Sequence, residues 1–285
     1  MEYHWKTRYL DLEQTLESGQ CFRWARREDG SYTGISGRHI LSVRQRGDEI
    51  IFDTAGKSDI QYWLSYFDSE TDYGRIIERF SADNTLKAAS SENPGIRILR
   101  QEPFETLISF IISQNNNIPR IKGIIGRLCD NFGEEIKSSH GVFRAFPDAK
   151  TLAGLSPDDL APLRAGFRVR YILDAAEKVN SGEVDLESID AMSADEGREY
   201  LKKITGVGDK VADCVLLFAY HKTDAFPSDV WIKRITAEYY ADGLPECMNG
   251  YRGIAQQYLY EYFRKKTAAA ADDKTDDKRK EAATV

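Results

Sequence analysis

The chain lacks the features that mark membrane and secreted proteins. None of its 285 residues fall in an apolar run that approaches the roughly 18 residues of a membrane span. The N-terminal sequence MEYHWKTRYLDLEQ has no apolar core of the kind found in signal peptides. We therefore expect a cytoplasmic protein that has no membrane partner.

Cysteine is scarce, and positive charge is not in excess. The four cysteines, Cys21, Cys129, Cys214 and Cys247, form no CxxC pair, which argues against a disulfide framework and a zinc site. The formal net charge of −7 argues against a protein that holds nucleic acid by bulk positive charge. Lysine and arginine still number 39, so a local basic face stays compatible with the composition.

Strand signals are confined to the first part of the chain. Runs of β-branched and aromatic residues at 31–35, 39–44 and 49–53 are separated by glycine-containing turns. From Ser58 onward the spacing of apolar residues is helical. The pattern predicts an α+β fold with three parts: an N-terminal domain with an antiparallel β-sheet (residues 1–94), a mostly α-helical domain (95–264), and a tail of alanine and mixed charge (265–285) that we expect to be disordered.

Apolar spacing and helix-start signals locate the individual helices. Proline at the first helical position and Ser or Asp at the cap are typical of such starts. We expect helices at 59–67, 73–80, 85–89, from 103 through 112, 118–132, from Ser156 onward, 170–181, 195–203, 210–220, 230–240 and 250–265.

The strongest functional pattern lies between Leu201 and Ile235. Gly206, Val207 and Gly208 form a tight turn between two predicted helices, and glycine permits a backbone path that side chains would block. The turn leaves amide groups at the start of the second helix unpaired, and these suit a phosphate. Lys210 follows in the first turn of that helix, and Asp229 stands where a third helix begins.

This combination resembles the helix-hairpin-helix DNA glycosylase superfamily, whose motif ends in a Gly/Pro-rich loop and an aspartate. The resemblance implies that Lys210 attacks the sugar C1′, displaces the base and leaves an imine, which permits β-elimination. Asp229 would stabilise positive charge at C1′ and assist proton transfer. Without such a reaction, Lys210 would be a solvated lysine at a helix start. Asp229 would then be a plain helix cap, a role that Ser228 could equally supply.

The same resemblance bears on cofactors. Some members of the superfamily hold an iron–sulfur cluster by four closely spaced cysteines after the catalytic helix. Only Cys247 follows Cys214 in this chain, so we expect no cluster and no required cofactor. The hairpin amides are expected to bind DNA phosphates, with a monovalent cation as a candidate ligand there.

Four further segments narrow the resemblance to the 8-oxoguanine DNA glycosylases. They are ESGQCFRW at 17–24, SQNNNIPR at 113–120, GFRVRY at 166–171 and IAQQYLY at 254–260. The resemblance implies a monomeric base excision repair enzyme. It would excise 8-oxoguanine opposite cytosine in double-stranded DNA and then cut the strand, in the nucleoid of a bacterium or the nucleus of a eukaryote.

The resemblance assigns four residues to the lesion base. The carbonyl of Gly19 would accept a hydrogen bond from N7–H, which 8-oxoguanine has and guanine lacks. Gln256 would bind the Watson–Crick edge, and Cys214 and Tyr260 would sandwich the base. The family has phenylalanine in place of Tyr260. The ordinary interpretations are a turn glycine for Gly19, core packing for Cys214 and Tyr260, and a solvated side chain for Gln256.

Another four residues are assigned to the opposite strand. Asn115, Arg120 and Arg168 would hold the orphaned cytosine, and Phe167 would fill the vacated stack as a wedge. A helix cap, solvated charges and a core aromatic are the alternatives. Trp231 stands where the family often has a histidine near the DNA backbone.

Two other functions stay open. A glycosylase for alkylated purines would share the aspartate, but such relatives usually lack the lysine. A non-catalytic hairpin module that only binds DNA would have no need of Gly19, Gln256 or Asp229.

Overall fold

Five antiparallel strands form the N-terminal sheet, in the order β1-β5-β4-β3-β2. The computed structural model describes the backbone of residues 1–282 and side chains as far as residue 267. The predicted strands are confirmed as β3, β4 and β5, whereas β1 and β2 were not predicted. The strands are β1 (Glu2–Lys6), β2 (Trp24–Arg26), β3 (Tyr32–Ser36), β4 (His39–Arg46) and β5 (Glu49–Asp53).

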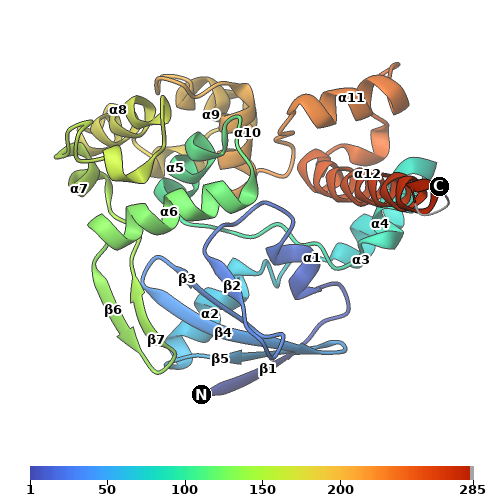
Figure 1. Cartoon of the computed structure of the whole chain (residues 1–285), viewed down its shortest axis with the longest axis horizontal. Helices are drawn as coiled ribbons and strands as arrows, with labels where there is room; N and C mark the ends of the chain where they lie inside the picture. Colours follow the sequence, from blue (N-terminus) through green and yellow to red (C-terminus); the bar gives the residue numbers. More distant parts are fainter. Residues whose placement is uncertain (283–285) are drawn as a thin grey trace.

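Two helices cover this sheet and close a small aromatic core. α1 (Leu12–Leu16) and α2 (Lys57–Tyr66) pack beside the strands, and Trp24, Phe52 and Trp63 are almost fully buried between them. Trp24 donates its indole N–H to the Tyr66 hydroxyl at 3.0 Å, which satisfies the polar atom of a buried ring. In Figure 1 the sheet lies below the helices of the rest of the chain.

The remaining elements are mostly helical and surround α5 (Pro103–Ser113). Leu107, Ile108, Ile111 and Ile112 of α5 are fully buried, because α6, α8 and α10 pack against it. The other helices are α3 (Tyr73–Phe80), α4 (Asn84–Glu92), α6 (Ile118–Phe132), α7 (Ala149–Ala153), α8 (Arg168–Asn180), α9 (Ala194–Leu201), α10 (Asp209–Phe218), α11 (Val230–Tyr239) and α12 (Arg252–Ala282).

The helical part departs from the sequence prediction at several points, one of which is the short helix α7, which was not predicted. A β-hairpin, β6 (Glu135–Ser138) and β7 (Gly141–Arg144), interrupts it. The helix predicted from Ser156 is wrong: the chain makes a turn there, followed by the short 3₁₀ helix Ala161–Leu163. The Ser156 hydroxyl donates to the Asp159 carboxylate at 2.6 Å, as at a helix start. The 3₁₀ helix nevertheless ends at Arg164, whose backbone is left-handed (φ 54°).

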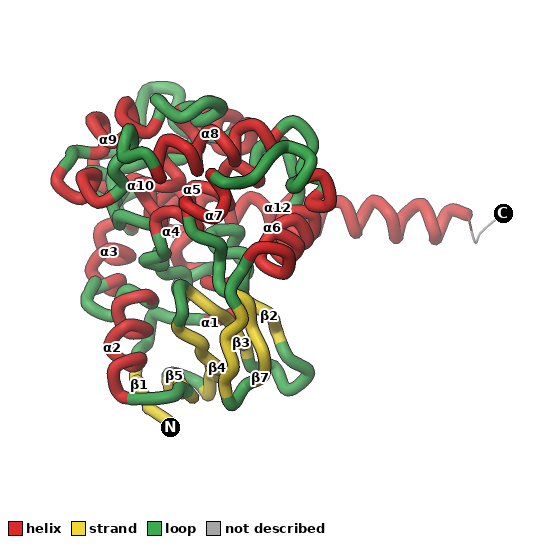
Figure 2. The backbone as a smooth tube through the Cα atoms, turned by 90° about the vertical axis from the view of Figure 1, so that its left-hand side faces the viewer, coloured by secondary structure: helices red, strands yellow, loops and turns green. Residues whose placement is uncertain are grey.

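The domain boundary expected after residue 94 stays a prediction, and the hydrophobic core of the helical part extends across it. α3 and α4 join the core of the helical body, and α4 packs on α12. The backbone of α12 continues as helix as far as Ala282, within the expected tail, and extends away from the body (Figure 2). The disorder expected for 265–285 stays a prediction, and its last three residues lie outside the described part. None of the helices in the described part is long and apolar enough to cross a membrane.

Candidate active site

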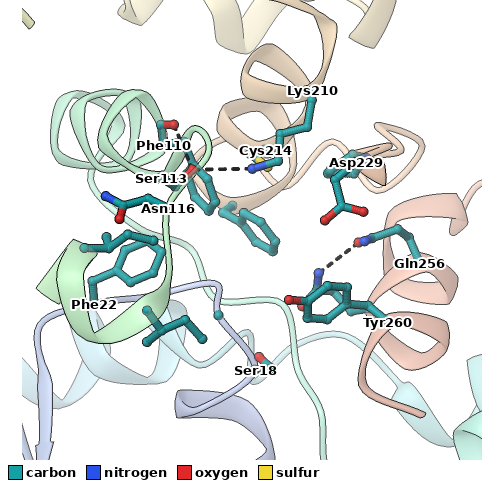
Figure 3. A pocket seen from close by; sticks show the side chains of 16 residues that line it. Ser18, Phe22, Phe110, Ser113, Asn116, Lys210, Cys214, Asp229, Gln256 and Tyr260 are labelled. Carbon is teal, nitrogen blue, oxygen red and sulfur yellow. Dashed lines mark hydrogen bonds between the residues drawn. The ribbon is translucent and has the colours of Figure 1, made fainter. Parts of the chain in front are cut away.

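A cavity of about 150 Å³ lies where the N-terminal part meets the helical body. The loop after α1 supplies one wall, α5 and α6 another, and the starts of α10 and α11 together with α12 close the remainder (Figure 3). Elements far apart in sequence therefore meet here. The lining residues are Ser18, Gly19, Phe22, Phe110, Ser113, Asn116, Ile118, Ile121, Lys210, Cys214, Phe218, Pro227, Asp229, Gln256, Gln257 and Tyr260.

The hairpin between α9 and α10 has the geometry that its glycines suggested. Gly206 adopts a left-handed φ of 83°, and a Cβ there would lie 2.4 Å from the Tyr171 ring. Gly208 is extended and caps α10 without a side-chain hydrogen bond. A Cβ on Gly208 would meet no atom within 4 Å. The first-turn amides of α10 thus have no capping side chain, and the space beside the Gly208 Cα is open.

Lys210 directs its amine into the cavity from the first turn of α10 (Figure 3). Its Nζ donates to the Ser113 hydroxyl at 3.4 Å and lies 5.2 Å from the centroid of the Phe110 ring. Both partners belong to α5, against which α10 packs. The amine is therefore held between an aromatic face and a hydroxyl.

Asp229 begins α11 and lines the same cavity. Its Oδ1 accepts the backbone N–H of Ile232 at 2.8 Å, so Asp229, not Ser228, is the helix cap. The carboxylate faces the cavity that also receives the Lys210 amine (Figure 3). Trp231, two residues on, is 40% exposed.

The four residues assigned to the lesion base all line the cavity. Gly19 has a φ of 83°, which L side chains rarely adopt. Burial raises the pKa of the Cys214 thiol to about 11, with the nearby Lys210 charge opposing the shift, so the thiol is neutral at physiological pH. Burial, followed by the Asp229 carboxylate, also raises the pKa of Tyr260. Gln256 is buried and lies on α12, the helix that also carries Tyr260.

Two of the residues assigned to the opposite strand, Asn115 and Phe167, line an adjoining groove of about 800 Å³. Asn115, in a left-handed turn (φ 49°), and Phe167, 50% exposed, line it together with Lys210 and Asp229. An exposed aromatic beside a groove is the arrangement that a wedge requires. Arg120 lies at the surface, where it donates to the Arg164 carbonyl at 3.5 Å.

Arg168 differs from this group because it is buried. Its Nε donates to the Gln114 carbonyl at 2.9 Å, and its Nη2 donates to the Asn115 carbonyl at the same distance. Nη1 donates to Ala165 at 3.1 Å. Burial, followed by the charge of Arg120, lowers the pKa of this guanidinium. Arg168 therefore holds the turn that presents Asn115, and a direct contact with cytosine stays a prediction.

Sequence reasoning missed several cavity residues. Phe110 and Ser113 lie on α5, whose apolar stripe indicated only core. Asn116 was one of three consecutive asparagines, and the pattern did not distinguish it from Asn115. Gln257 follows the assigned Gln256. The two glutamines lie three and four residues before Tyr260, a spacing that places them on the same face of a helix as Tyr260.

A hairpin with open amides, followed by a lysine and a capping aspartate at one cavity, defines a DNA glycosylase of the helix-hairpin-helix class. Two family models together match residues 3–244. One is described as the N-terminal domain of 8-oxoguanine DNA glycosylase and matches residues 3–107. The other, HhH-GPD superfamily base excision DNA repair protein, matches residues 108–244.

Individual relatives agree with the family models. The N-glycosylase/DNA lyase of Saccharomyces cerevisiae is 34% identical over 258 residues, which cover 81% of this chain and 68% of that protein. The solved structure of MBOgg1 with a low-affinity DNA ligand is 42% identical, with a TM-score of 0.88 over 93% of this chain and 96% of that one. The Clostridium acetobutylicum 8-oxoguanine glycosylase/lyase, solved with double-stranded DNA containing cytosine opposite 8-oxoG, is 35% identical, with a TM-score of 0.87 over 94% and 98%.

The chain therefore belongs to the 8-oxoguanine DNA glycosylase family of the HhH-GPD superfamily, and it is a base excision DNA repair enzyme with N-glycosylase and DNA lyase activities. The resemblance stated from the sequence and the α+β fold class are both confirmed.

Proposed function

We propose that this enzyme excises 8-oxoguanine opposite cytosine through a Schiff base on Lys210 and then cuts the strand by β-elimination. The observation that carries the proposal is the position of Lys210 and Asp229 in one cavity with all four residues assigned to the lesion base. The flipped base would occupy that cavity, and the rest of the duplex would follow the adjoining groove and the hairpin.

The proposed reaction begins with the neutral amine of Lys210. Its nitrogen forms a bond to C1′ as the bond between C1′ and N9 breaks, and the base departs with the electron pair. Opening of the sugar ring at O4′ gives an imine. Loss of a C2′ proton and of the 3′ phosphate then cuts the strand. Asp229 stabilises the positive charge that develops at C1′.

Selection of the lesion rests on N7. The Gly19 carbonyl accepts from N7–H of 8-oxoguanine, whereas guanine would place a bare acceptor against it. An unmade buried hydrogen bond costs about 1–3 kcal/mol. Cys214 and Tyr260 stack on the two faces of the base, which returns about 1–3 kcal/mol of the unstacking cost.

The rest of the duplex is held outside the cavity. Asn115 and Arg120 bind the orphaned cytosine with Arg168, and Phe167 fills the gap in the stack. The amides of residues 206–208 bind phosphates of the lesion strand.

The same proposal includes a monovalent cation at this hairpin. It also includes a monomeric enzyme that requires no cofactor. The compartment would be the one that holds the DNA, the nucleoid or the nucleus.

Trapping of the covalent intermediate tests the lysine. With a duplex that holds 8-oxoguanine opposite cytosine, borohydride should reduce the imine and leave wild-type protein attached to DNA. Lys210→Gln should keep lesion binding and lose trapping, excision and strand cleavage. An active wild-type enzyme that yields no trapped complex would contradict the Schiff base. Duplexes with each of the four bases opposite the lesion test the preference for cytosine.

A further inference from the structure

Gln257 is a second buried glutamine in the base cavity. Its side chain is only 5% exposed and lines the cavity beside Gln256 and Tyr260. Its Nε2 donates to Gln256 Oε1 at 2.8 Å. Its own Oε1 is buried and has no hydrogen-bond partner among the described residues. Buried polar atoms without partners are rare, and one in a binding cavity indicates a group that a ligand supplies.

The hydrogen bond between the two glutamines fixes which of their amide atoms are already paired. Because Gln256 Oε1 accepts from Gln257, the Nε2 of Gln256 is left as a donor. The unpaired Oε1 of Gln257 is an acceptor. The pair therefore offers one donor and one acceptor side by side.

We infer that Gln257 is a specificity-determining residue that, with Gln256, recognises the guanine-type edge of the lesion. The Watson–Crick edge of 8-oxoguanine carries one acceptor, O6, and two adjacent donors, N1–H and the 2-amino group. Gln256 Nε2 donates to O6, and Gln257 Oε1 accepts from the donors. An adenine-type edge has the opposite pattern, with a 6-amino donor and a bare N1. This inference rests on the proposed function of the cavity.

Two other lining side chains already use oxygens in the fold. The hydroxyl of Ser18 donates to the Thr15 carbonyl at 3.0 Å and accepts from Gln20 at 3.1 Å. Asp229 Oδ1 is used by the helix cap. Of the side-chain atoms that are buried and unpaired in the described residues, the Gln257 oxygen is the one that belongs to this cavity.

The test compares excision of 8-oxoguanine with excision of 8-oxoadenine, which keeps the C8 oxygen and N7–H but reverses the edge. Single-turnover rates are measured with enzyme in excess on matched duplexes. Wild type is compared with Gln257→Met, which keeps the length of the side chain but has no amide, and with Gln257→Glu, which keeps an acceptor. The ratio of the two rates is taken within one variant, so a loss of folded protein cancels.

We expect Gln257→Met to lower the preference for 8-oxoguanine at least about 10-fold, the effect of leaving a buried hydrogen bond unmade. Gln257→Glu should retain most of the preference. A ratio in Gln257→Met within about twofold of the wild-type ratio would overturn the role of Gln257 and leave the proposed function standing. Wild-type enzyme that fails to excise 8-oxoguanine would contradict the proposed function, and the role of Gln257 with it.

Discussion

Asp229 combines a role in the fold with its proposed role in the reaction. One oxygen caps α11 through the Ile232 amide, and the side chain faces the Lys210 amine across the cavity. The helix start thereby holds the carboxylate in place before a substrate binds. Such preorganisation lets a charge stabilise a transition state without reorganising during the reaction.

Asp229→Asn separates these two roles, because asparagine caps helices about as well as aspartate but carries no charge. We expect excision to slow by at least ~10²-fold, the typical loss for an acid/base group, with an almost unchanged melting temperature. Single-turnover excision and thermal unfolding measure the two effects. Asp229→Ala is the control, and it should also lose about 1 kcal/mol of stability with the cap. Near-wild-type excision by the asparagine variant would leave Asp229 as a cap alone.

At the scale of elements, the two hairpin glycines serve different purposes. Gly206 has a left-handed backbone and lies against the Tyr171 ring, so the fold itself requires glycine there. Gly208 is extended and faces open space, so the folded protein alone does not require it. The absence of a side chain at Gly208 is useful where a DNA backbone approaches the α10 amides.

This difference predicts opposite results for two alanine variants. Gly206→Ala should destabilise the protein by at least about 1–2 kcal/mol, because alanine disfavours the left-handed region and its Cβ meets the ring. Gly208→Ala should cost less than about 1 kcal/mol but weaken binding to duplex DNA several-fold. Chemical denaturation and DNA titration at fixed salt measure these effects. Equal DNA affinity for wild type and Gly208→Ala would argue against a phosphate at this hairpin.

The elements that the sequence predicted are those with local signals. Residues 118–132 form a helix with the predicted bounds, because Asn117 caps it and Pro119 fits its first turn. β1 carries no comparable local signal, and its partner β5 lies more than forty residues away along the chain, as the pairing of Glu2 with Asp53 shows. Ser156 carried a correct cap signal, but helix continuation depends on the residues that follow.

The same distinction applies to the site. Lys210 and Asp229 stand at helix starts, which motif spacing can locate. Arg168 was predicted to hold the orphaned cytosine, and the structure buries it against the carbonyls of a turn more than fifty residues earlier. Such a contact depends on the packing of α5 and α8, which no local pattern encodes.

At the scale of the whole molecule, the buried carboxylate of Asp68 joins the N-terminal part to the helical body. Asp68, after α2, has a fully buried side chain and accepts from His221, after α10, at 2.9 Å. Tyr73 donates to the same carboxylate at 2.9 Å, and Arg100 at 3.0 Å. Burial alone would raise the pKa of Asp68, but hydrogen bonds from His221 and Thr71, together with the charge of Arg100, outweigh it and lower the pKa to about 2.

Asp68→Asn should therefore destabilise the whole protein. Asparagine tolerates the left-handed backbone of this position (φ 50°), so the change removes mainly the charge. A pKa lowered from 3.8 to about 2 corresponds to roughly 2 kcal/mol of stability. Because the folded-state pKa is depressed, this contribution is complete above about pH 4 and is lost as the pH falls through about 2.

Denaturant unfolding between pH 7 and pH 2.5 measures this contribution as the difference between wild type and Asp68→Asn. The difference should be about 2 kcal/mol at neutral pH and should narrow below about pH 4, because protonation removes the same charge from the wild-type side chain. Asp72→Asn is the matched control, since Asp72 lies in the same loop, caps α3 and is 63% exposed. Its unfolding free energy should stay within about 0.5 kcal/mol of wild type throughout. If the two variants behaved alike, the buried Asp68 carboxylate would not be what joins the N-terminal part to the helical body.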